Sequence, residues 1–141
     1  MPQIKEEEKM SKFEIRKFDP VIYPRKVWVA KGGTKKNLAD IFDDMERDPY
    51  MVSDDVVDNS YAMTDDVVER SSGDYGVVVW LHKLNDITTG IIAHEADHAA
   101  NQIFKAIGAK VDVTNDEPHA YLVGFITDCI HKVKTGRYDR E

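Results

Sequence analysis

Three stretches of the chain carry the hydrophobic pattern of β-strands. Residues 21–30 hold two β-branched or aromatic runs separated by Pro24, which predicts one irregular strand or two short ones. Residues 61–70 and 75–84 predict two further strands, joined by the turn-forming residues 71–74. Of all the segments, residues 75–84 have the most strongly β-like composition.

Helical periodicity marks three other segments. Apolar residues at helical spacing predict an amphipathic helix over residues 35–47, capped by Thr34. A long and unusually apolar helix is predicted from residue 88 or 89 to residue 107, where Gly108 ends it. A last helix is predicted over residues 115–136, with its cap at position 115 or 116.

The order of these elements predicts the fold class. Strand, helix, two strands and two helices indicate an α+β domain with a mainly antiparallel sheet and the helices to one side. The length of 141 residues suits one domain, over residues 13–141, preceded by a flexible, highly charged N-terminus over residues 1–12. The acidic segment 50–61 has no regular pattern and predicts a solvated loop.

Charge and composition exclude several classes of function. The net charge of -7 argues against a general nucleic-acid binder, because neutralising phosphates requires clustered Lys and Arg. No apolar run is long enough for a membrane span, and the N-terminal segment has no apolar region typical of a secretory signal. Cys129 is the only cysteine, which excludes an intrachain disulfide and favours a buried packing role. We therefore expect a cytoplasmic protein without nucleic-acid or membrane partners.

Residues 94–98 read His-Glu-Ala-Asp-His and lie within the predicted helix 88–107. Positions i and i+4 share one face of a helix, so the imidazoles of His94 and His98 can bind one metal ion. Glu95 stands beside them to transfer a proton. Two histidines that only hydrogen-bond to neighbours on a buried helix are the alternative, although such polar groups are costly to bury in an apolar segment unless they are satisfied.

The motif resembles the gluzincin branch of the zincin metallopeptidases, which carry H-E-x-x-H on one helix and a glutamate at the start of the next. Glu117 opens the next predicted helix here. Residues 115–124 also resemble a stretch of small H-E-x-x-H proteins that are common in bacteriophage genomes. The likeness covers residues 75–130, whereas residues 1–60 match nothing.

The resemblance implies a compact zincin-like domain in which an active-site helix is followed by a glutamate helix. It implies a Zn²⁺ ion held by His94, His98 and Glu117, with His119 as the alternative third ligand. Three protein ligands leave one position open for water. The metal lowers the pKa of that water and polarises a carbonyl group, while Glu95 acts as general base.

Two further features of the resemblance concern the substrate. An oxyanion stabiliser is needed, and Tyr121 ranks first because it lies one turn beyond the glutamate, with His119 and His82 as other candidates. In zincins an edge strand before the active-site helix holds an extended peptide by backbone pairing, and residues 75–83 stand at that place in this sequence. A role in the interior of the sheet is the alternative for this strand.

The leading hypothesis is therefore a zinc metallopeptidase, or a related amide hydrolase, that acts on a peptide or protein substrate. The alternative is a non-catalytic interaction protein on a zincin scaffold, for example one encoded by a phage and aimed at a host protein. A third reading is a different metal-dependent hydrolase or a metal sensor. Replacing Glu95 by Gln separates the first two, because it should abolish hydrolysis and leave partner binding intact.

Overall fold

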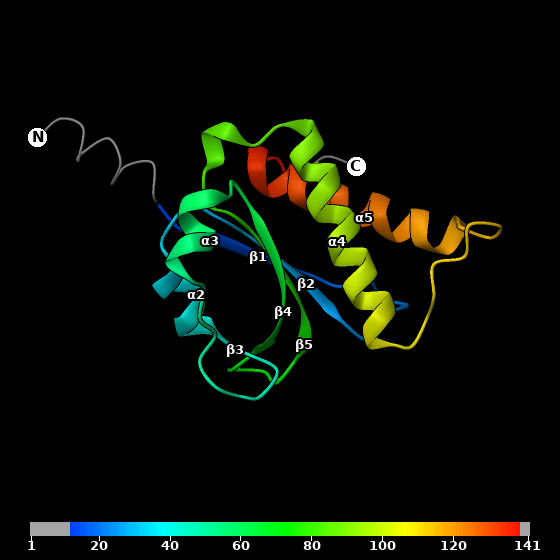
Figure 1. The fold of residues 1–141 in the computed structure, drawn as a ribbon, viewed down its shortest axis with the longest axis horizontal. Helices are drawn as coiled ribbons and strands as arrows, with labels where there is room; N and C mark the ends of the chain where they lie inside the picture. The colour runs from blue at the N-terminus through cyan, green and yellow to red at the C-terminus, as the bar shows by residue number, and fades with distance from the viewer. Residues whose placement is uncertain (1–11, 139–141) are drawn as a thin grey trace, which may run out of the picture.

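The computed structural model describes residues 12–138, in which a five-stranded sheet separates two layers of helices (Figure 1). The strands are β1 (Glu14–Phe18), β2 (Lys26–Lys31), β3 (Phe42–Asp43), β4 (Met63–Glu69) and β5 (Tyr75–Leu81). The helices are α2 (Lys35–Ile41), α3 (Asp54–Asn59), α4 (Thr89–Ala106) and α5 (Glu117–Thr135), with a short 3-10 turn over Leu84–Asp86. Apart from position 12, the expected flexible N-terminus lies outside the described residues.

The sheet has the strand order β1-β2-β5-β4-β3 and is mixed. Three of its four strand pairs are antiparallel, and β2 and β5 run parallel with Val29 opposite Val79. The α+β class is confirmed, and the sheet is mainly antiparallel as expected. β5 lies in the centre and is covered on both faces, which explains its unbroken hydrophobic run.

Helices cover both faces of the sheet, so the expectation that all helices lie to one side is wrong (Figure 1). Successive residues of a strand point to opposite faces. In β2, Val27 and Val29 pack into the core beneath α4 and α5, whereas Trp28 and Ala30 pack into a second core beneath α2 and α3. Since both sets are apolar and fully buried, each face needs a covering layer.

Helix α2 ends at Ile41, not at residue 47 as predicted. Phe42 and Asp43 leave the helix and pair with β4, and Phe42 is fully buried in the second core. Asp43 is buried and accepts a hydrogen bond from the Arg70 Nε at 2.9 Å. Arg47 then takes a left-handed backbone conformation at φ 68°, which is incompatible with a continuing helix.

Two elements stand where the sequence analysis expected none. β1 forms the edge of the sheet beside β2, and its mixture of charged and apolar residues gives no clear strand pattern in the sequence. The acidic segment 50–61 contains α3 instead of an irregular loop. Ser53 caps this helix by accepting a hydrogen bond from the Val56 backbone N–H at 3.2 Å.

The two long helices that carry the candidate site are confirmed close to their predicted bounds. Thr88 caps α4 and accepts a hydrogen bond from the Ile91 N–H, and Gly108 follows the helix at φ 75°. Asp116 stands at the start of α5, and Gly136 ends it at φ 72°. Glycine is favoured at such left-handed ends. No helix within residues 12–138 is long and apolar enough to cross a membrane.

Candidate metal site on helix α4

His94 and His98 lie on the exposed face of α4, one turn apart. Their Nε2 atoms are 3.0 Å apart, and the two rings meet edge to face with centroids 4.5 Å apart. Two imidazole nitrogens on a tetrahedral zinc ion, with Zn–N bonds of about 2.0–2.1 Å, are separated by about 3.3 Å. The i, i+4 spacing brings both rings to the same side of the helix, but here the two nitrogens are in hydrogen-bond contact with each other. Zinc binding therefore requires the rings to turn until both lone pairs meet at one point.

Glu95 points to a different side of the helix from the histidines. It is 7% exposed, and its carboxylate Oε1 accepts a hydrogen bond from the Thr64 hydroxyl of β4 at 2.7 Å. Consecutive helical residues are about 100° apart around the axis, so this orientation follows directly from the position of Glu95 next to His94. Thr64 is a contact that the sequence analysis did not foresee.

His94 and Glu95 nevertheless line one hollow of about 490 Å³ at the N-terminal end of α4. Its other walls come from the segment before β4 and the first turn of the helix, namely Ser60, Tyr61, Ala62, Thr88, Gly90 and Ile91. The Ser60 hydroxyl also lies 3.0 Å from the Nε2 of His82. Burial, with a smaller contribution from Lys83, lowers the pKa of His82, which keeps this ring neutral at pH 7.

The structure does not bring Glu117 or Tyr121 to the histidine pair. Among residues 12–138, no third His, Cys, Asp or Glu has a ligand atom within 4.8 Å of both imidazoles. Glu117 and Tyr121 instead border a separate, largely apolar hollow of about 450 Å³ with the loop before β2. Tyr121 is 75% exposed there. In this conformation the assignment of Glu117 as third ligand stays a prediction that needs the start of α5 to move.

His119 is a polar side chain of α5 that contacts the motif helix. Its Nε2 lies 2.7 Å from the Oδ1 of Asn101 and 4.0 Å from the Oδ1 of Asp97, and its ring meets Phe104 edge to face. The sequence carried a signal for this orientation. Leu122 and Ile126, both buried, follow His119 at positions i+3 and i+7, so His119 shares the inward stripe of α5.

β5 does not serve as the substrate-binding edge strand suggested by the zincin resemblance. It is paired with β2 on one side and β4 on the other, so its backbone groups are already used within the sheet. The alternative reading of residues 75–83, a strand in the interior of the sheet, is the correct one.

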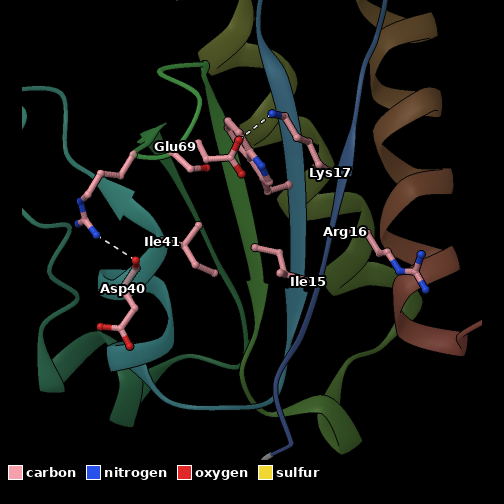
Figure 2. A pocket seen from close by; sticks show the side chains of 9 residues that line it. Ile15, Arg16, Lys17, Asp40, Ile41 and Glu69 are labelled. Carbon is pink, nitrogen blue, oxygen red and sulfur yellow. Dashed lines mark hydrogen bonds and ion pairs between the residues drawn. The ribbon is translucent and has the colours of Figure 1, made fainter.

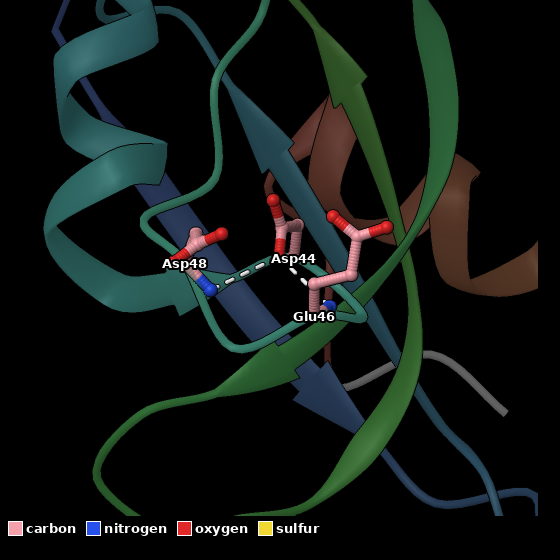
Figure 3. Close-up of side chains that lie close together, drawn as sticks. All are labelled: Asp44, Glu46 and Asp48. Atoms are coloured by element: carbon pink, nitrogen blue, oxygen red, sulfur yellow. Dashed lines mark hydrogen bonds between the residues drawn. The ribbon is translucent and has the colours of Figure 1, made fainter.

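The described residues contain one cluster of three potential metal-ligating side chains, formed by Asp44, Glu46 and Asp48 (Figure 3). The Oδ1 of Asp44 accepts the backbone N–H groups of Glu46 and Asp48, at 2.9 and 3.0 Å. These two bonds hold the loop in a tight turn, and the three carboxylates therefore lie close together. An all-oxygen set of this kind suits hard cations and not zinc, and hard cations such as calcium need about six or more oxygen ligands.

A further hollow of about 580 Å³ lies on the opposite face of the sheet, beneath α2 (Figure 2). Its charged side chains all have partners within the hollow or just outside it. Lys17 Nζ lies 2.7 Å from the Oε1 of Glu69, and Arg70 donates to the Asp40 carbonyl oxygen at 2.9 Å. These contacts hold α2 against the sheet, so the hollow is a product of packing.

Comparison with protein-family models, with curated proteins and with solved structures gives no match. The functional assignment therefore depends on the residues of the site.

Proposed function

We propose that the protein is a zinc-dependent hydrolase of amide bonds, a metallopeptidase or a related enzyme. His94 and His98 are its zinc ligands, and Glu95 is its general base. The observation that carries the proposal is the 3.0 Å separation of the two Nε2 atoms beside a hollow that also contains Glu95. Bound zinc would supply an activated water molecule and polarise the substrate carbonyl.

The residues of the hollow have separate roles in this proposal. Glu95 accepts the proton of the attacking water and returns it to the leaving amine. The Thr64 hydroxyl holds the carboxylate in place before the reaction, and Glu95 must turn from it towards the hollow to act. The Ser60 hydroxyl also borders the hollow. It donates its proton to the Val56 carbonyl oxygen at 2.6 Å and lies 3.0 Å from the His82 Nε2, so it would have to release the carbonyl oxygen to stabilise an oxyanion.

The third protein ligand is assigned to α5. The contacts of His119 with Asn101 and Phe104 place it against the motif helix, whereas Glu117 borders another hollow. These contacts support His119 over Glu117, and either side chain has to move to reach the histidine pair, because neither has a ligand atom within 4.8 Å of both imidazoles. Asn101 would then hold the His119 ring through its Nε2, as hydrogen-bond acceptors commonly do for ligand histidines, which leaves Nδ1 as the nitrogen that would bind the metal.

Elemental analysis and a hydrolysis assay test the proposal together. We expect wild-type protein to bind zinc, His94→Ala to lose it, and Glu95→Gln to keep it while hydrolysis of a peptide library falls about 10²–10⁴-fold. His119→Gln and Glu117→Gln compare the two third-ligand candidates, and zinc affinity should fall only in the first. Absence of zinc from the wild type after zinc is added would overturn the proposal.

A non-catalytic interaction protein is the second candidate, and the Thr64–Glu95 hydrogen bond favours it. A buried carboxylate bonded to a neighbouring strand can serve to anchor α4 to the sheet without any chemistry. On this reading Thr64→Val destabilises the fold, because it leaves the buried carboxylate without a partner. Wild type and Glu95→Gln would then be equally inactive in hydrolysis.

A further inference from the structure

The outer edge of β4 is paired over only part of its length. β5 lies along one side of the strand, whereas β3 on the other side covers only Val68 and Glu69. Within residues 12–138, no strand lies on that side of residues 63–67. Asp65, in the middle of this stretch, is exposed to solvent. A strand edge without a partner presents a row of N–H and C=O groups with which another chain can pair.

Two hydrogen bonds at the end of β4 show which main-chain groups face the open side. The N–H of Glu69 donates towards β5 and the N–H of Arg70 donates towards β3, each 2.9 Å from its acceptor. Successive residues of a strand direct their N–H and C=O groups alternately to the two neighbouring strands. The N–H and C=O groups of Thr64 and Asp66, which lie an even number of residues before Arg70, therefore point away from β5 to the open side.

A carboxylate lies over this open edge. The Oδ1 of Asp65 accepts the N–H of Asp66 at 2.9 Å, and its Oδ2 accepts the hydroxyl of Tyr50 at 3.0 Å. Charged side chains on edge strands commonly prevent unwanted pairing. A lysine or arginine side chain on a strand opposite Asp65 would bind the carboxylate, and the Asp66 N–H would then be free for a main-chain hydrogen bond.

The charge of the edge indicates the kind of partner. Besides the exposed Asp65, the loop that begins where β3 leaves the sheet carries Asp44, Glu46 and Asp48, whose carboxylates lie within 4.8 Å of one another (Figure 3). A second copy paired along this edge would bring such carboxylates together, in chains that each carry a net charge of -7. Like charges on paired strands are destabilising and opposite charges are stabilising, so a basic segment fits here and a second copy does not.

We propose that the open edge of β4, residues 63–67, binds an extended basic segment of a partner protein as an added antiparallel strand. The segment continues the line of β3 and pairs with the outward groups of Thr64 and Asp66. Main-chain hydrogen bonds supply affinity, and lysine or arginine at every second position supplies specificity. β1, the other edge strand, carries Arg16 and Lys17 and therefore does not attract such a segment. The binding needs no metal, so it goes beyond the proposed function and does not depend on it.

The test is a calorimetric titration of the full-length protein, in the presence of a chelator, with a short end-blocked peptide of alternating lysine and threonine. We expect binding that weakens as the salt concentration rises. Hydrogen exchange followed by NMR should show added protection at the amides of Thr64 and Asp66. The amides of Asp65 and Val67, which face β5, should not change. Purely electrostatic binding would not produce this alternation.

Two modified peptides separate main-chain pairing from charge. The same peptide with methylated amide nitrogens keeps its lysines but cannot donate main-chain hydrogen bonds, so we expect it not to bind. A peptide of alternating glutamate and threonine can pair but has the wrong charge, and it should not bind either. Both controls leave the protein unchanged, so they do not depend on the folding of a variant.

Asp66→Pro and Asp66→Asn are the matched variants. Both remove the carboxylate, but only proline removes the outward N–H, and proline is tolerated in a strand where its N–H side faces solvent. We expect Asp66→Pro to bind the lysine peptide about tenfold more weakly than Asp66→Asn, near the upper end of the worth of one hydrogen bond.

Several results would overturn the proposal. They are the absence of binding by the lysine peptide, equal binding of either modified peptide, and equal affinity of the two Asp66 variants. A dimer of the chain alone that Asp66→Pro abolishes would show that a second copy occupies the edge. Zinc content and hydrolysis are measured separately, so failure here would leave the zinc site of the proposed function standing.

Discussion

Asp66 shows how one carboxyl group can weaken the fold near the candidate site. It lies on β4, two residues after Thr64, and therefore on the same face of the strand. Burial raises the pKa of Asp66, and the neighbouring charge of Asp65 adds to the rise, while Lys105 and Arg25 partly offset it. Above its pKa the group is charged in surroundings that disfavour the charge, so it lowers stability at neutral pH.

We expect Asp66→Asn to stabilise the protein at pH 7. With a raised pKa, the folded state binds a proton that the unfolded state has already released above about pH 3.9, so stability falls as the pH rises through this window. The amide does not titrate, and the gain should vanish below about pH 4. Urea denaturation between pH 3 and pH 8 measures this, with the exposed Asp128→Asn as control. A gain that persists or grows at low pH would contradict the argument.

The residue scale also shows what the sequence could predict about the site. The i, i+4 spacing of His94 and His98 was enough to predict that their nitrogens meet, because helix geometry alone fixes it. The position of Glu117 was not fixed by the motif. Which side chain of α5 faces α4 depends on the rotation of that helix, which is set by its buried stripe, and His119 shares that stripe.

At the scale of elements, long hydrophobic patterns predicted the helices and strands well, whereas short patterns did not. β5, α4 and α5 each present a strong apolar pattern over seven residues or more, and their bounds were predicted closely. β3 has two residues and exists only because it pairs with β4, a contact that no local pattern encodes. Phe42 continued the apolar helical spacing beyond Ile41, and a helix was therefore predicted to residue 47. In the structure Phe42 belongs to β3 and packs into the second core.

The parallel pairing of β2 with β5 gives a prediction at this scale. Gly76 stands opposite Lys26, and a Cβ atom at Gly76 would lie 2.0 Å from the Lys26 carbonyl oxygen. A backbone atom within a sheet cannot easily move away. We expect Gly76→Ala to lower the free energy of unfolding by about 3 kcal/mol, near the upper end for overpacked sites.

A matched glycine on α5 serves as the control for that experiment. Gly124 is exposed within the helix, and an added Cβ would meet nothing within 4 Å. Alanine is about 1 kcal/mol more favourable than glycine inside a helix, so Gly124→Ala should stabilise the protein by up to that amount. Urea denaturation of both variants measures the difference. Equal stabilities for Gly76→Ala and the wild type would show that β2 and β5 can separate without cost.

At the scale of the whole molecule, the two helical layers are unequal. α4 and α5 have 18 and 19 residues and share an extensive core with the sheet. α2 and α3 have seven and six residues, far below the length at which a helix is stable by itself. The layer of short helices therefore depends on contacts with the sheet, whereas the layer that carries the histidine pair has a large core of its own.

Arg70 makes many of the contacts that hold α2 to the sheet. Its guanidinium donates hydrogen bonds of 2.9 Å to the carbonyl oxygens of Ala39, Asp40 and Phe42 at the end of α2, and to the carboxylate of Asp43. The carbonyl groups at a helix end have no partners within the helix, so these bonds satisfy them. Asp43 is 7% exposed and needs the positive charge of Arg70 beside it.

We expect Arg70→Met to destabilise the protein by about 3 kcal/mol, because it leaves a buried carboxylate and several helix carbonyls without their main partner. Hydrogen exchange measured by mass spectrometry should show protection falling first in residues 35–59, while α4 and α5 keep most of theirs. Arg47→Met is the control, since Arg47 Nε lies 3.6 Å from Asp43 and the side chain is half exposed. If α4 and α5 lose protection together with α2 in Arg70→Met, the molecule unfolds as one unit. The histidine face of α4 would then share its stability with the opposite side of the sheet.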